Sequence, residues 1–116
     1  MAAGQYDITV EQGTTFALQI AVKSRNLSGA TTARNLVGMT GRGQMRRKYS
    51  DPEIAAAFSV TIPDPADGIV AVGLTAEQTA GLLAKPHVYD IELVSPDGAV
   101  MRLVQGAATV TPEVTK

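Results

Sequence analysis

The sequence predicts an all-β fold, an immunoglobulin-like antiparallel β-sandwich of about seven strands with one short helix before the penultimate strand. Apolar residues alternate with polar ones in several short segments, Gly, Pro and Asp separate these segments, and strands do not alternate regularly with helices. The likeness to immunoglobulins lies in this layout alone, because the chain has no cysteine and no tryptophan. We expect residues 1–116 to form a single domain, since domains most often contain about 100–150 residues. A small open barrel is the alternative.

Two strands are expected near the N-terminus. Alternation of apolar and polar residues begins at Tyr6 and breaks at Gln12. Residues 14–22 then alternate without a break, which is the clearest strand pattern in the chain. The apolar face of that strand consists of Phe16, Leu18, Ile20 and Val22. Residues 23–40 are small and polar, and loops seldom exceed about 12–15 residues, so we expect a short strand or a contact loop there.

The middle of the chain contains two further predicted strands separated by a turn. Residues 41–48 form the first, with its polar side chains on one face. The turn at residues 50–53 is expected to lead into a helical turn over residues 54–57. Residues 58–62 form the second strand, which Pro63 is expected to stop.

A capping motif marks the only predicted helix. After a strand at residues 69–74, Thr75 and Gln78 have the spacing of a capping box, in which each side chain bonds the backbone of the other residue. The helix is expected to run from Ala76 to about Leu83. Pro86 then returns the chain to an extended conformation.

A hairpin is predicted over residues 88–104. Pro96, Asp97 and Gly98 suit a type I turn followed by a left-handed glycine, which places Ser95 opposite Ala99. Beyond Val104, Gly106 is expected to interrupt the strand, and residues 109–111 either continue the pairing or leave as a tail. The predicted register pairs Val94 with Val100, Leu93 with Met101, Glu92 with Arg102 and Ile91 with Leu103.

This register separates the hairpin into two unlike faces. The inner face is apolar and contains Tyr89, Ile91, Leu93, Met101 and Leu103. The outer face mixes apolar and charged side chains, namely Asp90, Glu92, Val94, Val100, Arg102 and Val104. Mixed faces of this kind are typical of assembly surfaces, so we expect this one to pack on another subunit through Val94, Val100 and Arg102.

The residues that suggest chemistry have simpler explanations. Asp90 and Glu92 are roughly 6.5–7 Å apart along a strand, near the spacing of inverting glycosidases, but an ion pair between Glu92 and Arg102 is the preferred interpretation. His87, the only histidine, is expected to be a half-exposed residue at a strand edge. We therefore predict a protein that is not an enzyme, with no catalytic residue, cofactor or metal.

Four of the ten basic residues cluster in one segment: Arg42, Arg46, Arg47 and Lys48, followed by Tyr49. Binding of nucleic acid is one interpretation, but the net charge is −1 and no nucleic-acid motif is present. Contact with an acidic neighbouring protein, or protection of an edge strand, explains the cluster better. No run of about 18 apolar residues is present, so we expect no membrane span.

Several segments together resemble small structural proteins of tailed bacteriophages, nearly from end to end. They include residues 6–8, 11–16, 46–52, 74–79, 89–93, 95–98 and the closing 110–114. The resemblance implies a virion component of the tail, baseplate or fibre-attachment region, assembled in the bacterial cytoplasm. Its partners would be other virion proteins and further copies of itself, and the family supplies no catalytic residues. Residues 25–43 depart from the family pattern.

Two other functions remain open beside this one. A capsid decoration protein would use the same fold on the lattice of the head. A carbohydrate-binding module would help the particle adsorb to its host, although such surfaces usually use exposed aromatic residues and this chain has few.

Overall fold

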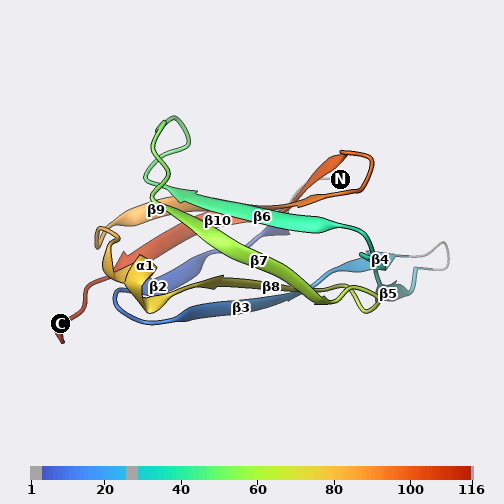
Figure 1. Ribbon diagram of the computed structural model, residues 1–116, viewed down its shortest axis with the longest axis horizontal. Coiled ribbons are helices and arrows are strands. Elements are labelled where there is room, and N and C mark those ends of the chain that lie inside the picture. Colours follow the sequence, from blue (N-terminus) through green and yellow to red (C-terminus); the bar gives the residue numbers. More distant parts are fainter. Residues whose placement is uncertain (1–3, 26–28, 116) are drawn as a thin grey trace.

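The computed structural model describes residues 4–25 and 29–115. Two layers of β-strands face each other, and the long axis of the molecule runs along the strands (Figure 1). One layer contains β6 (Thr40–Arg46), β9 (Pro86–Val94) and β10 (Val100–Thr111). The other contains β3 (Phe16–Ala21), β8 (Ile69–Leu74) and most of β7 (Ala56–Asp64).

The strand β7 belongs to both layers. Its first residues, Ala56–Phe58, pair with β6, and the rest pair with β8, so that β7 crosses diagonally between the layers (Figure 1). With the short β1 (Gly4–Gln5), the strands thereby form one curled sheet in the order β1-β10-β9-β6-β7-β8-β3. Strands β6, β9 and β10 are arranged as the C, F and G strands of an immunoglobulin domain, and β3, β8 and β7 as its B, E and D strands. The predicted antiparallel sandwich is therefore confirmed.

The N-terminal strands pair in parallel with the last strand. These strands are β1 (Gly4–Gln5) and β2 (Ile8–Glu11). The backbone of Tyr6 passes so close to β10 that a Cβ on Gly106 would lie 2.3 Å from its carbonyl oxygen. The prediction that Gly106 interrupts the strand is wrong, because glycine here permits this approach and β10 continues to Thr111.

Segment 23–40 contains two short strands, β4 (Lys23–Arg25) and β5 (Thr31–Ala33), which form a separate two-stranded sheet. The prediction of a short strand there is confirmed. The helical turn predicted over residues 54–57 is wrong. The backbone N–H of Ala55 donates to the Met45 carbonyl oxygen, and β7 begins at the next residue, Ala56. Pairing with β6 therefore holds this segment extended.

The helix α1 (Ala76–Ala80) precedes the penultimate strand, as predicted. The Gln78 N–H donates to the Thr75 hydroxyl at 3.1 Å, and the Gln78 side-chain Oε1 accepts from the Thr75 N–H at 2.8 Å. These two bonds confirm the capping box. The predicted end near Leu83 is wrong. Gly81 caps the helix, and Leu82 turns into the core with 4% of its surface exposed.

The hairpin between β9 and β10 follows the predicted register at its tip. Val94 pairs with Val100, Leu93 with Met101 and Glu92 with Arg102, and Gly98 has the expected positive φ of 89°. The register then shifts between Arg102 and Val104, so that Ile91 pairs with Val104. The predicted pair of Ile91 with Leu103 is therefore wrong, and Val104 is buried where an outward side chain was expected.

The core lies between the two layers. Phe58 from β7 and Tyr89 from β9 meet edge to face with their ring centroids 5.9 Å apart. The most deeply buried large side chains are Leu36, Met45, Ile91, Leu93, Val10 and Val70. Because β6 and β9 contribute buried residues to this core, their alternate side chains point out of the sandwich on one common face.

Candidate functional site

The outward side chains of β6, β9 and β10 form one surface, which we call the outer sheet face. Rows across this face follow the strand register. Arg42 and Arg102 lie on either side of Glu92, and Gln44 and Gln105 lie on either side of Asp90. The outer sheet face therefore carries alternating positive, negative and amide groups at the spacing of neighbouring strands.

Two ion pairs organise these charges. Arg42 Nε lies 2.8 Å from Glu92 Oε1, and Arg102 Nε lies 3.4 Å from Asp90 Oδ2. The predicted ion pair of Glu92 with Arg102 is wrong. Glu92 and Arg102 are opposite each other, but β9 also has β6 as a neighbour. Glu92 therefore pairs with Arg42 on β6, and Arg102 pairs with Asp90 instead.

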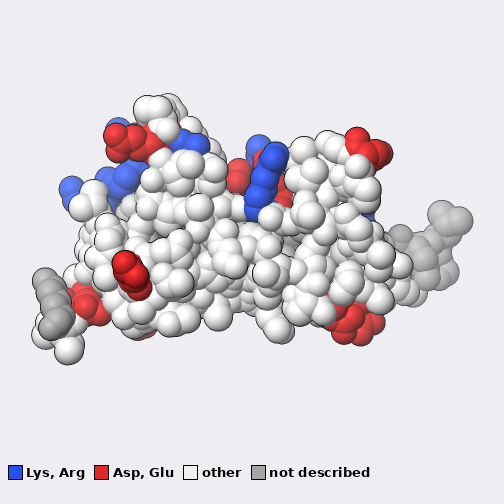
Figure 2. Space-filling view, in the orientation of Figure 1, with Lys and Arg blue, Asp and Glu red and all other residues white. Residues whose placement is uncertain are grey.

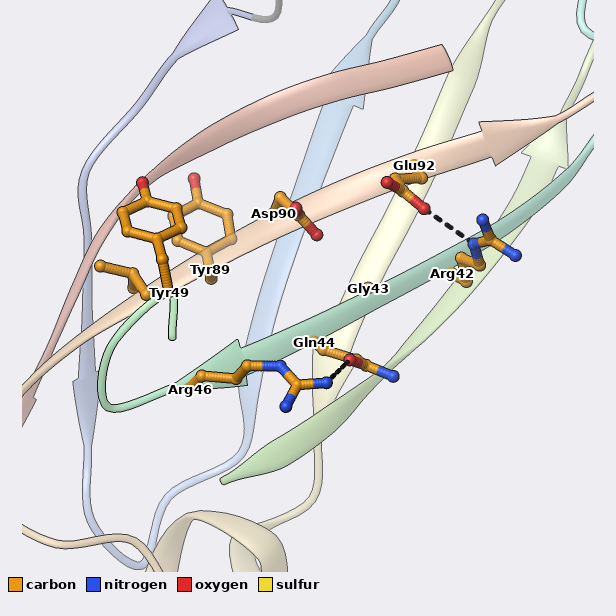
Figure 3. A pocket seen from close by; sticks show the side chains of 9 residues that line it. Arg42, Gly43, Gln44, Arg46, Tyr49, Tyr89, Asp90 and Glu92 are labelled. Carbon is orange, nitrogen blue, oxygen red and sulfur yellow. Dashed lines mark hydrogen bonds and ion pairs between the residues drawn. The ribbon is translucent and has the colours of Figure 1, made fainter. Parts of the chain in front are cut away.

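A cavity of about 400 Å³ opens between β6, β9 and the loop after β6. Figure 2 shows basic and acidic groups gathered along this edge of the molecule, while most of the visible face below is uncharged. Figure 3 shows Arg42, Arg46, Asp90, Glu92 and Tyr49 around the cavity. Its lining is completed by Gly43, Gln44, Val88 and Tyr89. The cavity therefore offers donors, acceptors and an aromatic ring together.

Arg46 is held by neutral groups. Its guanidinium donates to Gln44 Oε1 at 2.9 Å and to the Asp51 carbonyl oxygen at 2.8 Å. Within residues 4–25 and 29–115, the ion pairs involve Arg42 and Arg102 but not Arg46. Tyr49 lines the same cavity and is 71% exposed. A guanidinium that makes no direct ion pair and lies beside an exposed ring is a favourable place for an approaching carboxylate.

The surroundings of Asp90 change the pKa of its carboxyl group. Burial raises the pKa of Asp90 above its usual value, and the nearby Glu92 carboxylate raises it further. The guanidinium groups of Arg102, Arg42 and Arg46 act in the opposite direction on this pKa. A partner that removed more water from this face would therefore favour the protonated form of Asp90 unless it supplied a donor or a cation.

The predicted contact residues belong mostly to this one face. Arg42, Arg46 and Tyr49 line the cavity, and Arg102 lies on the neighbouring strand. The cross-strand pair of Val94 and Val100 lies at the hairpin end of the same face, with Val100 51% exposed. The two contact surfaces inferred separately from the sequence are thus continuous.

The other two basic residues lie off this face. Arg47 donates to the carbonyl oxygen of Pro86, and Lys48 is exposed in the loop. The interpretation that the basic cluster protects an edge strand is wrong, because β6 lies between β9 and β7.

Sequence reasoning did not place Gln44 in the site or recognise that Asp90 and Glu92 line a cavity. Both follow from the pairing of β6 with β9. A signal for that pairing was present, since Arg42 and Arg46 lie on one face of their strand, and Asp90 and Glu92 lie on one face of theirs. Faces of opposite charge favour adjacent strands.

His87 is buried, with 2% of its surface exposed, so the prediction of a half-exposed histidine is wrong. Its Nδ1 lies 2.7 Å from the Lys85 carbonyl oxygen, and Leu82 and Arg47 line the hollow beside it. Burial lowers the pKa of His87, the bond to Lys85 opposes this effect, and the charge of Arg47 adds to it.

The part of the chain that the structure describes contains no group of three or more His, Cys, Asp or Glu side chains that could hold a metal ion. No helix in that part is long and apolar enough to cross a membrane. No family model matches this chain, and no curated protein matches it.

Proposed function

We propose that this chain is a non-enzymatic structural protein of a tailed bacteriophage, located in the tail, baseplate or fibre-attachment region. It contacts other virion proteins through the outer sheet face. The resemblance of its sequence segments to phage structural proteins supports the setting. The geometry of the outer sheet face supports the mode of action.

The observation that carries this proposal is the continuity of that face. Tyr49 and Arg46 lie at one end, and the Val94–Val100 pair lies at the other. Tyr and Arg are enriched where protein interfaces derive most of their binding energy. The exposed Val100 and the partly buried Val94 add apolar area that a partner would remove from water.

The ion pairs on the face favour a specific partner. Arg42 is 61% exposed and Glu92 22% exposed at their side chains, so a pairing surface would reach both charges. Complementary charges align interfaces and exclude wrong partners, although they contribute little affinity by themselves. Arg46, which makes no direct ion pair among the described residues, favours an acidic group on the neighbouring protein.

Immunogold electron microscopy of intact particles tests the location. Label at the tail end is expected. Label over the head would instead favour the capsid decoration protein, and unlabelled particles that also lack the chain by mass spectrometry would contradict a virion role.

Particle complementation tests the face itself. The variants Val100→Glu and Arg46→Glu are expected to lower incorporation of the chain into particles. Thr61→Glu places the same charge on an exposed position of β7 in the other layer and is expected to incorporate normally. Normal incorporation of all three variants would contradict the use of this face.

Carbohydrate binding is a second candidate, favoured by the composition of the cavity. Tyr49 provides an exposed ring, and Gln44, Asp90 and Glu92 provide polar groups around it. Sugars bind to such combinations of aromatic and hydrogen-bonding side chains. A glycan-array signal that is lost in Tyr49→Ala would support this candidate, and its absence would favour protein contacts.

A further inference from the structure

The strand β3 is an edge of the curled sheet. It pairs with β8 along its whole length, from Phe16 opposite Leu74 to Ala21 opposite Ile69, and with no other strand described in the structure. Its outward side chains, Ala17, Gln19 and Ala21, are exposed. The second edge of β3 is therefore accessible to another strand.

The backbone groups on this free edge follow from the register with β8. The N–H of Val22 donates to the Gly68 carbonyl oxygen at 2.8 Å, which continues the β3–β8 ladder by one pair. In an antiparallel ladder, hydrogen-bonded and non-hydrogen-bonded pairs alternate. Ile20, Leu18 and Phe16 consequently direct their N–H and C=O groups toward β8. The N–H and C=O groups of Ala17, Gln19 and Ala21 point away from β8, toward the free edge.

Nothing in β3 protects this edge from pairing. Natural edge strands are commonly blocked by lysine, proline, an inward charge or a bulge. The sequence of β3 is Phe-Ala-Leu-Gln-Ile-Ala, without charge or proline, and its register with β8 has no irregularity. The other end of the curled sheet differs, because β1 contains only two residues.

An apolar groove runs beside the same edge. It has a volume of about 500 Å³ and lies between β3 and the segment where β1 pairs with β10. Leu18 and Ile20 from β3, and Met101 and Leu103 from β10, line it and are only partly buried. A strand added to β3 would cover these side chains and remove them from water.

We propose that β3 pairs with β3 of a second copy of this chain, antiparallel and about a two-fold axis at Gln19. This register places Gln19 opposite Gln19 of the second copy and Ala17 opposite Ala21. All three residues of the free edge then form hydrogen-bonded pairs, and each pair exchanges two hydrogen bonds. The edge is thus self-complementary, as a two-fold interface requires.

The side chains fit the same register. Leu18 lies opposite Ile20 of the second copy as a non-hydrogen-bonded pair, in which side chains approach most closely. Both point to the inner side of the sheet, over the apolar groove. The outer side carries only alanines and the two glutamine amides, which can bond each other across the axis.

The charges at the two ends of β3 are also complementary. Lys23 and Arg34 lie at the C-terminal end, where both line the groove. Glu11 precedes the N-terminal end, and the Glu113 carboxylate lies beside Gly13 there. An antiparallel two-fold arrangement brings the basic end of each copy to the acidic end of the other, twice. This charge arrangement selects a second copy of the chain as the occupant.

The dimer is built on the edge of β3, whereas the outer sheet face is built on β6, β9 and β10, and of the residues that form the ion pairs of that face only Arg102 also lines the groove. Both surfaces can be occupied in the same particle, one between copies and one toward a different protein. A failure of the dimer and a failure of the proposed virion role are therefore distinguishable.

The first test is the mass of the purified chain in solution, measured by light scattering during size exclusion across a range of concentrations. The wild type is expected to reach twice the 12.1 kDa mass of the chain. Gln19→Lys and Gln19→Glu each place like charges opposite each other at the axis and are expected to remain monomeric. An equal mixture of the two variants is expected to restore the dimer. Thr61→Lys, an exposed position of the same layer, is the matched control and should dimerise.

Cross-linking tests the register. The chain has no cysteine, so Gln19→Cys introduces a single thiol. Residues in a hydrogen-bonded pair have Cα atoms about 5.5 Å apart, which a disulfide can span. Oxidation is expected to link Gln19→Cys into a covalent dimer and to leave Thr61→Cys monomeric. A monomeric wild type, a dimer that survives Gln19→Lys, or equal cross-linking of both cysteine variants would overturn the proposal.

Discussion

The close passage of the N-terminal segment over Gly106 gives the sharpest stability prediction. In Gly106→Ala, the new Cβ would meet the Tyr6 carbonyl oxygen at 2.3 Å, the Tyr6 carbonyl carbon at 2.8 Å and Asp7 Oδ1 at 2.9 Å. Two of these atoms are backbone, which cannot move aside as a side chain can. We expect the segment that contains Tyr6 and Asp7 to leave its position on β10.

The cost can be worked out from the bonds that this displacement breaks. The Tyr6 N–H donates to the Gln105 carbonyl oxygen at 3.0 Å, and the Ala107 N–H donates to Asp7 Oδ1 at 3.0 Å. The Tyr89 hydroxyl donates to the Tyr6 carbonyl oxygen. A typical hydrogen bond contributes a net 0.5–1.5 kcal/mol, so losing these three lowers the free energy of unfolding by roughly 1.5–4.5 kcal/mol.

Two measurements check this expectation. Urea unfolding gives the change in the free energy of unfolding, and alkaline titration of tyrosine absorbance follows the pKa of Tyr89. Burial, followed by the nearby Tyr6 and Asp7, raises that pKa to about 12. In Gly106→Ala it should fall toward the ordinary value of about 10.

Gly4→Ala is the matched control, because it lies in the same segment but its Cβ would be 3.6 Å from the Leu103 carbonyl oxygen, an ordinary contact. Its free energy of unfolding should stay within about 0.5 kcal/mol of the wild type. If Gly106→Ala behaved like this control and Tyr89 kept its raised pKa, the reasoning from steric contact would be refuted.

Three further predictions concern single residues. The pKa of Tyr89 is about 12 in the folded state against about 10 when unfolded, so the contribution of its neutral hydroxyl to the free energy of unfolding is fully present below about pH 10. The free energy of unfolding should fall by about 2–3 kcal/mol as the pH rises toward 12, and urea unfolding of Tyr89→Phe should show no such loss. Because burial and Glu92 raise the pKa of Asp90, Asp90→Asn should increase the free energy of unfolding at neutral pH; a decrease would mean that its bond to Arg102 dominates. Thr75→Ala removes the acceptor for the Gln78 N–H and should cost about 1 kcal/mol in urea unfolding, whereas an unchanged midpoint would show that α1 is held by packing alone.

Local signals predicted the elements that local interactions determine. The turn residues of the β9–β10 hairpin fix the pairing of Val94 with Val100, and the Thr75–Gln78 capping box fixes the start of α1. The alternation over residues 14–22 predicted β3 for the same reason. In each case the residues that carry the pattern also make the deciding contacts.

The features missed in the sequence depend on distant neighbours. The bulge near Leu103 occurs where β1 joins β10, a contact between the two ends of the chain. The sequence nevertheless carries a trace of it, because the inward apolar residues are odd-numbered before the bulge, at Met101 and Leu103, and even-numbered after it, at Val104, Ala108 and Val110. The position of Gly106 has a similar cause, since only the passage of Tyr6 requires glycine there.

The sequence predicted which residues belong to the candidate site, but not which of them pair with each other. Arg42, Arg46 and Tyr49 were expected at a contact surface, and they line one cavity. The ion pair of Arg42 with Glu92 needed the knowledge that β6 lies beside β9, and no turn connects these strands. Pairing between strands far apart in the sequence is where single-sequence reasoning has least information.

The parallel pairing of β2 with β10 has a mechanical consequence. Ile8 pairs with Ala108 and Glu11 with Thr111, so the chain enters this ladder at one end of the molecule and leaves it at the other (Figure 1). Tension applied through residues 4 and 115 would slide the two strands along each other, loading their hydrogen bonds together. Tension applied across the β9–β10 turn would instead separate β9 from β10, and the hydrogen bonds between these two strands would break one after another. In single-molecule stretching, we expect a higher rupture force in the first geometry than in the second, so the chain should resist load along its length better than across the hairpin.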